Sequence, residues 1–214
     1  VKGDASTRGT FTIKSPNYIG DNSANLNYTT QGDVVTGTNP TPPATSAKVY
    51  DWVGGVSGSQ NSWSVAGNWY QNAVPGISDL VRIGVARSFS HQPTVSNNPV
   101  IGYLIVGGSQ GFSSPELTIN GAAASLTVNG DFTNSRSSKI SGNGSLIVNG
   151  NWTTSGGKID LTTGSVTVKF TGANAQTIKD DGSDAGSGVV FGNVEFSNAG
   201  TKTLAGSGKF AVAI

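Results

Sequence analysis

A short run of carboxylates is the strongest candidate for a metal site in this sequence. Asp180, Asp181 and Asp184 lie within five residues of one another, in a stretch rich in glycine and serine whose flexible backbone could wrap a Ca²⁺ ion. The run lacks the glutamate that closes an EF-hand loop, and it does not recur at a fixed interval as Ca²⁺-binding repeats do. We therefore expect a solvated loop between two strands, with a Ca²⁺ site as the alternative and no other cofactor.

Aromatic side chains gather between residues 50 and 70. Trp52, Trp63 and Trp69 lie within eighteen residues of one another and are followed directly by Tyr70. Exposed rings among asparagine and glutamine side chains can stack on sugars, so this stretch is a candidate carbohydrate-binding surface. The alternative is a cap over the first coil of a stacked β-fold, because an open end exposes apolar core and unpaired strand edges. A sugar-binding surface requires exposed indoles, whereas a cap buries them.

Groups suited to acid–base or nucleophilic catalysis are few. The twelve carboxylates include only two glutamates, Glu116 and Glu195, and the chain has one histidine and no cysteine. His91 has no triad-like spacing of serine and aspartate around it. The position after a repeated Asn-Gly pair is Asp131 in one copy and Asn151 in the next, so the acid is not repeated. We expect no enzymatic activity; the weaker alternative is a polysaccharide-active enzyme, which needs carboxylates that converge on one face.

A repeated element must position all of these side chains. The segments Leu126–Phe132 and Leu146–Trp152 share the pattern Leu-x-Val-Asn-Gly-(Asp/Asn)-aromatic and begin twenty residues apart, and a degenerate third copy starts at Val166. A fixed period of this size is typical of a solenoid, in which each repeat buries its apolar face against its neighbours. Apolar and polar residues alternate within each copy, which indicates strands. We predict an all-β parallel β-helix, or β-solenoid, with coils of about twenty residues; an antiparallel β-sandwich is the alternative.

Two rows of apolar residues are expected to form the core of this stack. The first row follows the repeated strands, and the second has one isoleucine about halfway along each coil. The predicted rows are Leu126, Val128, Leu146, Val148, Val166 and Val168, and then Ile119, Ile140, Ile159 and Ile178. Asn129 and Asn149 then lie directly above one another at a corner, where amides stacked along the coils hydrogen-bond to each other.

The composition agrees with a glycine-cornered β-fold. Glycine accounts for 31 of 214 residues, about twice the usual share of ~7%, and charged residues make up 12%, about half of the usual ~25%. Lysine and arginine are scattered singly at a net charge of +1, so no basic stripe tracks phosphates and nucleic acid is not an expected partner. No run of eighteen apolar residues is present, so we expect no membrane-spanning helix.

The sequence divides into four parts. Residues 1–36 read as an N-terminal extended or β segment, and 37–48 as a linker rich in proline and threonine. Residues 49–106 form the aromatic-rich cap and the first coils, and 107–214 form the solenoid repeats. Because the last residues enter a strand with nothing polar to cover it, we expect the repeats to continue beyond Ile214.

Two motifs resemble those of a known group of proteins. The pattern W-x-G-G-x-x-G-x-x-x-x-W of residues 52–63, followed by Asn68-Trp69 and by V-P-G-x-x-D at 74–79, resembles the opening segment of very large surface proteins of Bacteroidetes. Residues 164–178 and 191–196 resemble their recurrent unit. The likeness covers residues 49–214. It implies a secreted cell-surface adhesin or filament protein, exported by the type IX secretion system and in some members tied to gliding.

These observations lead to an expected function. Coils that stack one by one make a stiff spacer, so we expect a non-enzymatic, extracellular structural or adhesive protein, a β-solenoid stalk or filament segment. The expected partners are other segments of the same long polypeptide and the secretion or surface machinery. Surface glycans and end-to-end self-association with further copies are additional candidates.

Overall fold

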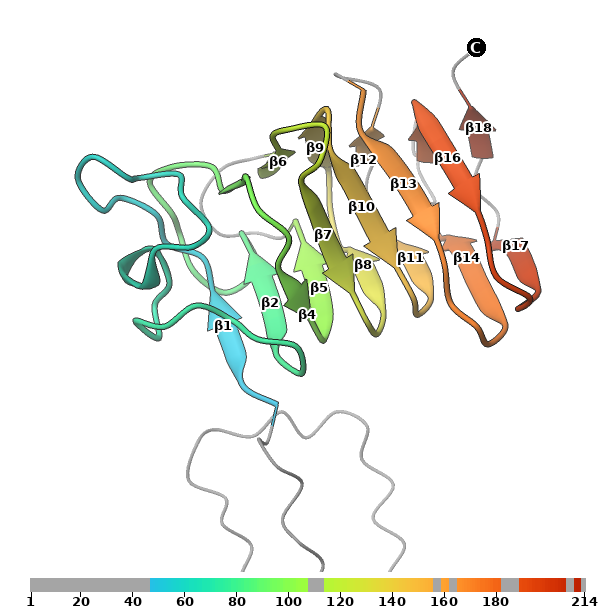
Figure 1. Cartoon of the computed structure of the whole chain (residues 1–214), viewed down its shortest axis with the longest axis horizontal. Helices are drawn as coiled ribbons and strands as arrows, with labels where there is room; N and C mark the ends of the chain where they lie inside the picture. The colour runs from blue at the N-terminus through green and yellow to red at the C-terminus, as the bar shows by residue number, and fades with distance from the viewer. Residues whose placement is uncertain are drawn as a thin grey trace, which may run out of the picture.

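The coils of the chain lie side by side along one axis (Figure 1). The computed structural model describes residues 47–107, 114–155, 159–161, 165–181, 189–206 and 210–212. Within these ranges the regular structure is β-strand, apart from one 3-10 turn, η1 (Ala66–Asn68). Over the same ranges, no helix is long and apolar enough to cross a membrane.

The strands of the described residues form three parallel sheets, which face one another around a common core. The seven-stranded sheet contains β1 (Val49–Asp51), β2 (Leu80–Ile83), β5 (Tyr103–Val106), β8 (Phe132–Asn134), β11 (Trp152–Thr154), β14 (Gln176–Asp180) and β17 (Lys202–Gly206). The five-stranded sheet contains β4 (Val100–Ile101), β7 (Ser125–Val128), β10 (Ser145–Val148), β13 (Thr167–Phe170) and β16 (Asn193–Phe196). The six-stranded sheet contains β3 (Thr94–Val95), β6 (Glu116–Ile119), β9 (Ser138–Gly142), β12 (Ile159–Leu161), β15 (Val189–Phe191) and β18 (Phe210–Val212).

Neighbouring strands run in the same direction and come from successive coils. Thr127 pairs with Ile147 in a parallel ladder, which confirms the predicted β-solenoid and excludes the antiparallel sandwich. That coil takes 20 residues, as the repeat predicts. Thr167 and Asn193 also pair, although they are 26 residues apart. The prediction of about twenty residues for every coil is therefore wrong, because loops of different length join strands that keep the same stacking.

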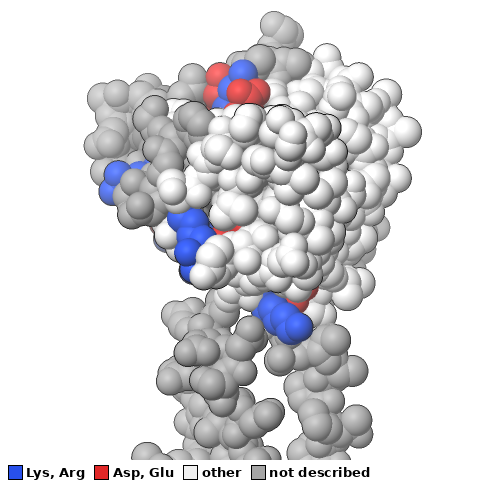
Figure 2. All heavy atoms as spheres, turned by 90° about the vertical axis from the view of Figure 1, so that its left-hand side faces the viewer, with Lys and Arg blue, Asp and Glu red and all other residues white. Residues whose placement is uncertain are grey.

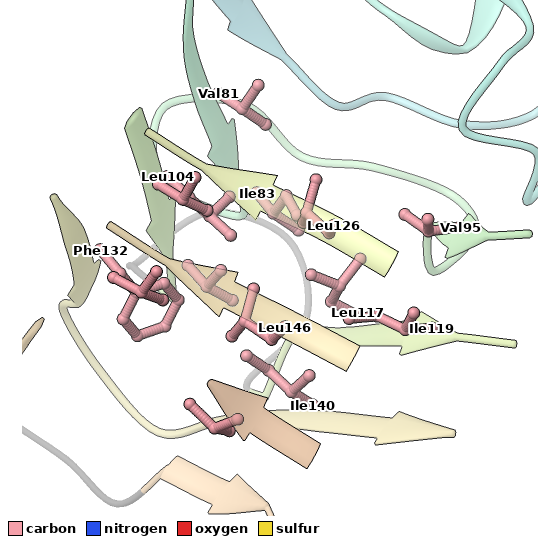
Figure 3. Close-up of a cluster of buried hydrophobic side chains, with 14 of the residues drawn as sticks. Val81, Ile83, Val95, Leu104, Leu117, Ile119, Leu126, Phe132, Ile140 and Leu146 are labelled. Atoms are coloured by element: carbon pink, nitrogen blue, oxygen red, sulfur yellow. The ribbon is translucent and has the colours of Figure 1, made fainter. Parts of the chain in front are cut away.

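The first predicted row of core residues is confirmed where β7 meets β10. Leu126 pairs with Leu146 and Val128 with Val148, and all four side chains are fully buried. Their outward neighbours on the strands are only partly buried, so the strands alternate as a half-buried sheet should. Figure 3 shows buried side chains from the three sheets pointing toward one another, among them Val81, Leu104, Leu126 and Leu117.

The same row shifts by two residues at the next coil. Leu146 pairs with Val168, and Val148 pairs with Phe170, so the predicted stacking of Leu146 on Val166 is wrong. The coil between these strands has two more residues than the one before it. A shift by two leaves each side chain on the same face of the sheet, and Val166 is still buried just before β13 begins.

The second predicted row does not form one column. Its members are all buried: Ile119, Ile140, Ile159 and Ile178. However, Ile159 pairs with Ser138 and Ile119 pairs with Gly142. Ile178 lies in the seven-stranded sheet beside Trp152, whereas the other three lie in the six-stranded sheet. A coil has three strands rather than the two that the rows assumed, so equal spacing along the sequence does not give stacking in space.

Glycine at the corners lets successive coils approach closely. A Cβ atom on Gly150 would lie 2.3 Å from the carbonyl carbon and oxygen of Gly130 in the coil below. Gly142 has a φ of +110°, and a Cβ there would lie 2.0 Å from the carbonyl oxygen of Ile119. Neither position tolerates a side chain, which explains the repeated glycine in the Asn-Gly pairs.

The N-terminal part of the sequence lies largely outside the described residues. These include the predicted segment 1–36 and the linker as far as residue 46, whose boundaries stay predictions. Lys48 is described, and its backbone N–H donates to Oδ1 of Asp79 at 2.9 Å. The first strand starts one residue later, at Val49.

Candidate functional site

Three tryptophans close the N-terminal end of the solenoid. Trp52, Trp63 and Trp69 are at most 1% exposed. The ring of Trp69 lies between the other two, with centroid distances of 5.0 Å to Trp52 and 4.7 Å to Trp63, both edge to face. The Nε1 atom of Trp69 donates to the carbonyl oxygen of Trp63 at 2.8 Å, and that of Trp52 donates to the carbonyl oxygen of His91 at 2.6 Å. The cluster is a compact cap with oriented rings.

The predicted carbohydrate-binding surface is not formed by these rings. Because Trp52, Trp63 and Trp69 are buried, none of them offers a face to a sugar, and the alternative prediction of a cap is correct. Tyr70 is 57% exposed, but the guanidinium carbon of Arg87 lies over its ring at 3.2 Å from the centroid. Figure 2, which views this end of the molecule, shows charged atoms in a few separate places on a largely uncharged surface.

The cap also covers the outer edges of two sheets. The backbone N–H of Tyr70 donates to the carbonyl oxygen of Asp51 in β1, and the Oε1 atom of Gln71 accepts from the N–H of Asp51. At β3, Thr94 exchanges backbone hydrogen bonds with Asn61 and Trp63. These bonds satisfy edge groups that would otherwise be open to pairing with another chain.

Asn68 holds the loops of the cap together. Its side chain is fully buried, and its Nδ2 atom donates to the carbonyl oxygens of Ser59 at 2.6 Å and Ser62 at 2.9 Å. Its Oδ1 atom accepts from the backbone N–H of Val56 at 2.9 Å. The sequence analysis noted Asn68-Trp69 only as part of a motif. A polar residue directly before a buried tryptophan was the available signal for this role.

A buried ion pair joins the first two strands. Arg82 in β2 donates from Nε and Nη2 to the two carboxylate oxygens of Asp51 in β1, each at 2.8 Å. Arg87 approaches the same carboxylate at 3.6 Å. Asp51 is 3% exposed, so the bidentate contact with Arg82 compensates for the loss of water around the charge. Burial, and after it the negative charge of Asp79, raises the pKa of the neighbouring Tyr50.

The predicted asparagine ladder is present at the corner between the five- and seven-stranded sheets. Nδ2 of Asn149 donates to Oδ1 of Asn129 at 3.2 Å, and the hydroxyl of Thr171 donates to Oδ1 of Asn149 at 2.5 Å. The ladder links three coils through side chains alone. Its place on a corner, with its groups bonded to one another, makes it a structural feature.

Asp131 and Asn151 act as turn caps. Oδ1 of Asp131 accepts from the backbone N–H of Asn151 at 2.7 Å, and Oδ1 of Asn151 accepts from the backbone N–H of Thr177 at 2.8 Å. An aspartate and an asparagine can do this equally well, because each supplies an acceptor oxygen at the same place. The alternation at this position therefore has a structural cause.

The described members of the Ca²⁺ candidate do not converge. Asp180 is fully buried at the end of β14, whereas Asp181 is exposed and pairs with the Nζ atom of Lys179 at 2.7 Å. Asp184 lies outside the described residues, as does the predicted loop at 182–188. In the part of the chain that the structure describes, no group of three His, Cys, Asp or Glu residues could hold a metal ion.

The candidate catalytic groups are dispersed over the surface. Glu116 pairs with Lys139 at 3.1 Å, and Glu195 pairs with Lys169 at 3.0 Å, each across neighbouring coils. His91 is exposed in the cap, and its Nδ1 atom lies 3.0 Å from the hydroxyl of Ser90. Glu116 lies in the six-stranded sheet and Glu195 in the five-stranded sheet, so the structure does not bring them together.

The C-terminal coil presents a different surface from the cap. Phe196 is 50% exposed, although it pairs with the fully buried Phe170, and the two rings are stacked at 5.5 Å. Leu204 is 56% exposed, although it pairs with the fully buried Ile178. Residues at core positions are thus uncovered in the last coil. This end is the largest departure from an ordinary protein surface among the described residues.

Comparisons of the chain with protein families, with curated proteins and with solved structures find no match. The function therefore has to be argued from the geometry of the coils and of their two ends.

Proposed function

We propose that this chain is a non-enzymatic structural segment of a secreted bacterial cell-surface protein, a stiff β-solenoid stalk that holds adhesive parts away from the cell. One observation carries the proposal, the continuity of the buried columns from coil to coil. Leu104, Phe132, Trp152 and Ile178 follow one another in the seven-stranded sheet, and each is fully buried. The fold thus places its apolar side chains in columns along one axis.

The direction of the hydrogen bonds supports a mechanical role. In a parallel stack the ladder bonds between coils run along the long axis, so stretching the stack strains many of them together. The corner contacts add to this, because Asn129, Asn149 and Thr171 link three coils by side-chain bonds. The stability of such a stack is approximately a sum of terms between nearest neighbours, so its length can change without a change of fold.

The extracellular location rests on different grounds. The motifs at residues 52–79 and 164–196 resemble those of very large Bacteroidetes surface proteins, for which export by the type IX secretion system is expected. The chain also has no cysteine, so its fold does not depend on the redox state of its surroundings. Expected partners are adjoining segments of the same surface protein and the machinery that exports or anchors it.

Duplication of one coil tests the mechanical proposal. A second copy of residues 125–144 inserted after residue 144 adds one coil in register, because Ser125 pairs with Ser145. We expect a cooperative fold whose long dimension grows by about 4.8 Å, measured by small-angle scattering. The matched control inserts the same twenty residues in scrambled order, which should lower the melting temperature. A duplicated variant that unfolds, or that does not lengthen, contradicts the proposal.

Labelling of cells tests the location. Antibodies against the purified chain, applied to intact and to permeabilised cells of the source organism, should give equal gold labelling at the outer surface in electron micrographs. Labelling that requires permeabilisation would refute a surface role and leave the mechanical proposal to be judged by the coil duplication.

A further inference from the structure

The two ends of the solenoid differ in how much core they leave uncovered. At the N-terminal end the buried tryptophans Trp52, Trp63 and Trp69 cover the first coil, and cap backbone occupies the outer edges of β1 and β3. At the other end, Phe196 and Leu204 are more than half exposed or close to it. The partners of these two residues in the preceding coil are completely buried.

The backbone at the C-terminal end is also open on one side. Among the described residues, β16 pairs only with β13, and β17 pairs only with β14, so each is the last strand of its sheet. An edge strand with apolar side chains beside it is a template for pairing with another strand. The end therefore presents both requirements for strand addition, unpaired backbone groups and uncovered apolar side chains.

Charge does not oppose the approach of two such ends. In residues 189–206 the charged side chains are Glu195 and Lys202. Glu195 is paired with Lys169 at 3.0 Å. The Nζ atom of Lys202 donates to the carbonyl oxygens of Gly172 at 2.9 Å and Gly200 at 2.8 Å. The described part of this end is thus close to neutral, and two copies meet without strong repulsion between like charges.

The cap restricts how copies can assemble. A head-to-tail arrangement would place the open end of one copy on the cap of the next, where the edges of β1 and β3 are already bonded. Two copies can cover each other's open ends only if both open ends face each other. A two-fold axis perpendicular to the solenoid axis gives this arrangement, and it reverses the strand direction of one copy relative to the other.

We propose that two copies of this chain associate through their open C-terminal ends into a two-fold dimer, with the edges of β16 and β17 paired to antiparallel edges of the partner and with Phe196 and Leu204 in the interface. The dimer is a closed assembly, because a cap then lies at each outer end. It deepens the proposed function by making the stalk a symmetric spacer, and for that meaning alone it rests on the proposed function. The association itself is independent of it.

Sedimentation velocity and light scattering over a concentration series test the dimer. The wild-type chain should sediment with twice the chain mass of 21.7 kDa. Phe196→Asp and Leu204→Asp should each raise the dissociation constant roughly tenfold or more, because they place a charge in an apolar interface. Ile77→Asp is the matched control, since Ile77 is 62% exposed in the cap and lies away from the open end. Circular dichroism should show the same melting profile for all three monomeric forms.

The outcome has three readings that overturn the inference. They are a wild-type chain that stays monomeric at all concentrations, a series of growing oligomers, and a dimer that Ile77→Asp disrupts while Phe196→Asp does not. The first would mean that some other partner covers the open end, and the second would mean head-to-tail growth.

Spin labels give the orientation independently of mass. The chain has no cysteine, so a single cysteine can be placed in the last coil as Asn198→Cys or in the cap as Ser57→Cys, both at exposed positions. In the proposed dimer, pulsed electron resonance should give a short distance between labels at residue 198 and a much longer one at residue 57. The reverse order overturns the inference. A dimer seen together with a coil-duplicated variant that fails to lengthen would refute the stalk function and leave this inference standing.

Discussion

Trp152 lies one coil above Phe132, with ring centroids 4.0 Å apart and ring planes inclined by 31°. Trp152 also contacts Phe170 and Phe191 edge to face, and its Nε1 atom donates to the hydroxyl of Thr154 at 3.0 Å. The ring therefore joins the cores of three successive coils. No other described side chain has ring contacts in as many coils outside the cap.

Removal of this ring should separate the two halves of the stack. Trp152→Ala is expected to destabilise the fold by about 3–5 kcal/mol, because it leaves a large cavity and an unpaired buried hydroxyl. Urea unfolding followed by circular dichroism measures the loss. Thr153→Ala, the outward neighbour on the same strand, is the control and should change stability by less than about 0.5 kcal/mol. Similar losses for both variants would contradict the assignment of inner and outer faces.

The corner glycines give a second prediction. Gly150→Ala places a Cβ 2.3 Å from the backbone of Gly130, so the coils must move apart, at an expected cost of about 1–3 kcal/mol or more. Gly76→Ala is the control, because its Cβ would meet only the carboxylate of Asp79 at 3.6 Å. Thermal melting should show a clear decrease for the first variant and little change for the second. An unchanged melting temperature for Gly150→Ala would mean that the corner is looser than the structure indicates.

A third prediction compares adjacent residues that point to different surroundings. Val148 is fully buried in β10, so Val148→Asp places a carboxylate in the core and should prevent folding of the central coils. Asn149 is partly exposed, and Asn149→Ala removes its bonds to Asn129 and Thr171 at an expected cost of about 1 kcal/mol. Proteolysis and circular dichroism of the purified variants distinguish the two. A folded Val148→Asp protein would overturn the predicted core row.

The repeat made the central coils predictable. Leu126 and Leu146 occupy the same place in two copies that differ by no insertion, so the period along the sequence equals the period in space. The Asn-Gly pairs at their ends fixed the corner and therefore the ladder from Asn129 to Asn149. Where the next coil gains two residues, the same reasoning placed Val166 in the position that Val168 occupies. A period alone cannot show which residues of a longer coil lie in the strand and which in the loop.

The cap was only partly predictable. Its aromatic residues were identified, but the sequence left open whether Trp52, Trp63 and Trp69 are buried, because burial depends on loops that fold back over them. The ion pair between Asp51 and Arg82 joins residues 31 positions apart and has no local signal in the sequence. Its partners become neighbours only because β1 and β2 stack in this register.

The ion pair of the cap leads to a fourth prediction. Asp51→Asn removes the charge that Arg82 and Arg87 face and is expected to destabilise the cap by about 1–3 kcal/mol. Glu195→Gln is the control, because Glu195 is 49% exposed in its pair with Lys169 and should contribute at most about 1 kcal/mol. Hydrogen exchange of backbone amides should show faster exchange in residues 49–83 for Asp51→Asn and no change in β10. Equal protection of the cap in both variants would mean that the tryptophans alone hold it.

The pH dependence of the cap gives the last prediction. Burial and the charge of Asp79 raise the pKa of Tyr50 above its ordinary value of about 10. Above that pH the unfolded chain loses the Tyr50 proton before the folded chain does, so the folded state binds more protons and stability falls as the pH rises. The contribution of Tyr50 is complete below about pH 10 and is lost as the pH passes the raised pKa of the folded state. Tyr50→Phe should therefore lessen the decline of stability at alkaline pH, measured by urea unfolding between pH 8 and pH 11, whereas Tyr103→Phe, at an exposed ring, should leave the curve as it is. A decline of the same size in wild type and Tyr50→Phe would show that another group controls the alkaline stability of the cap.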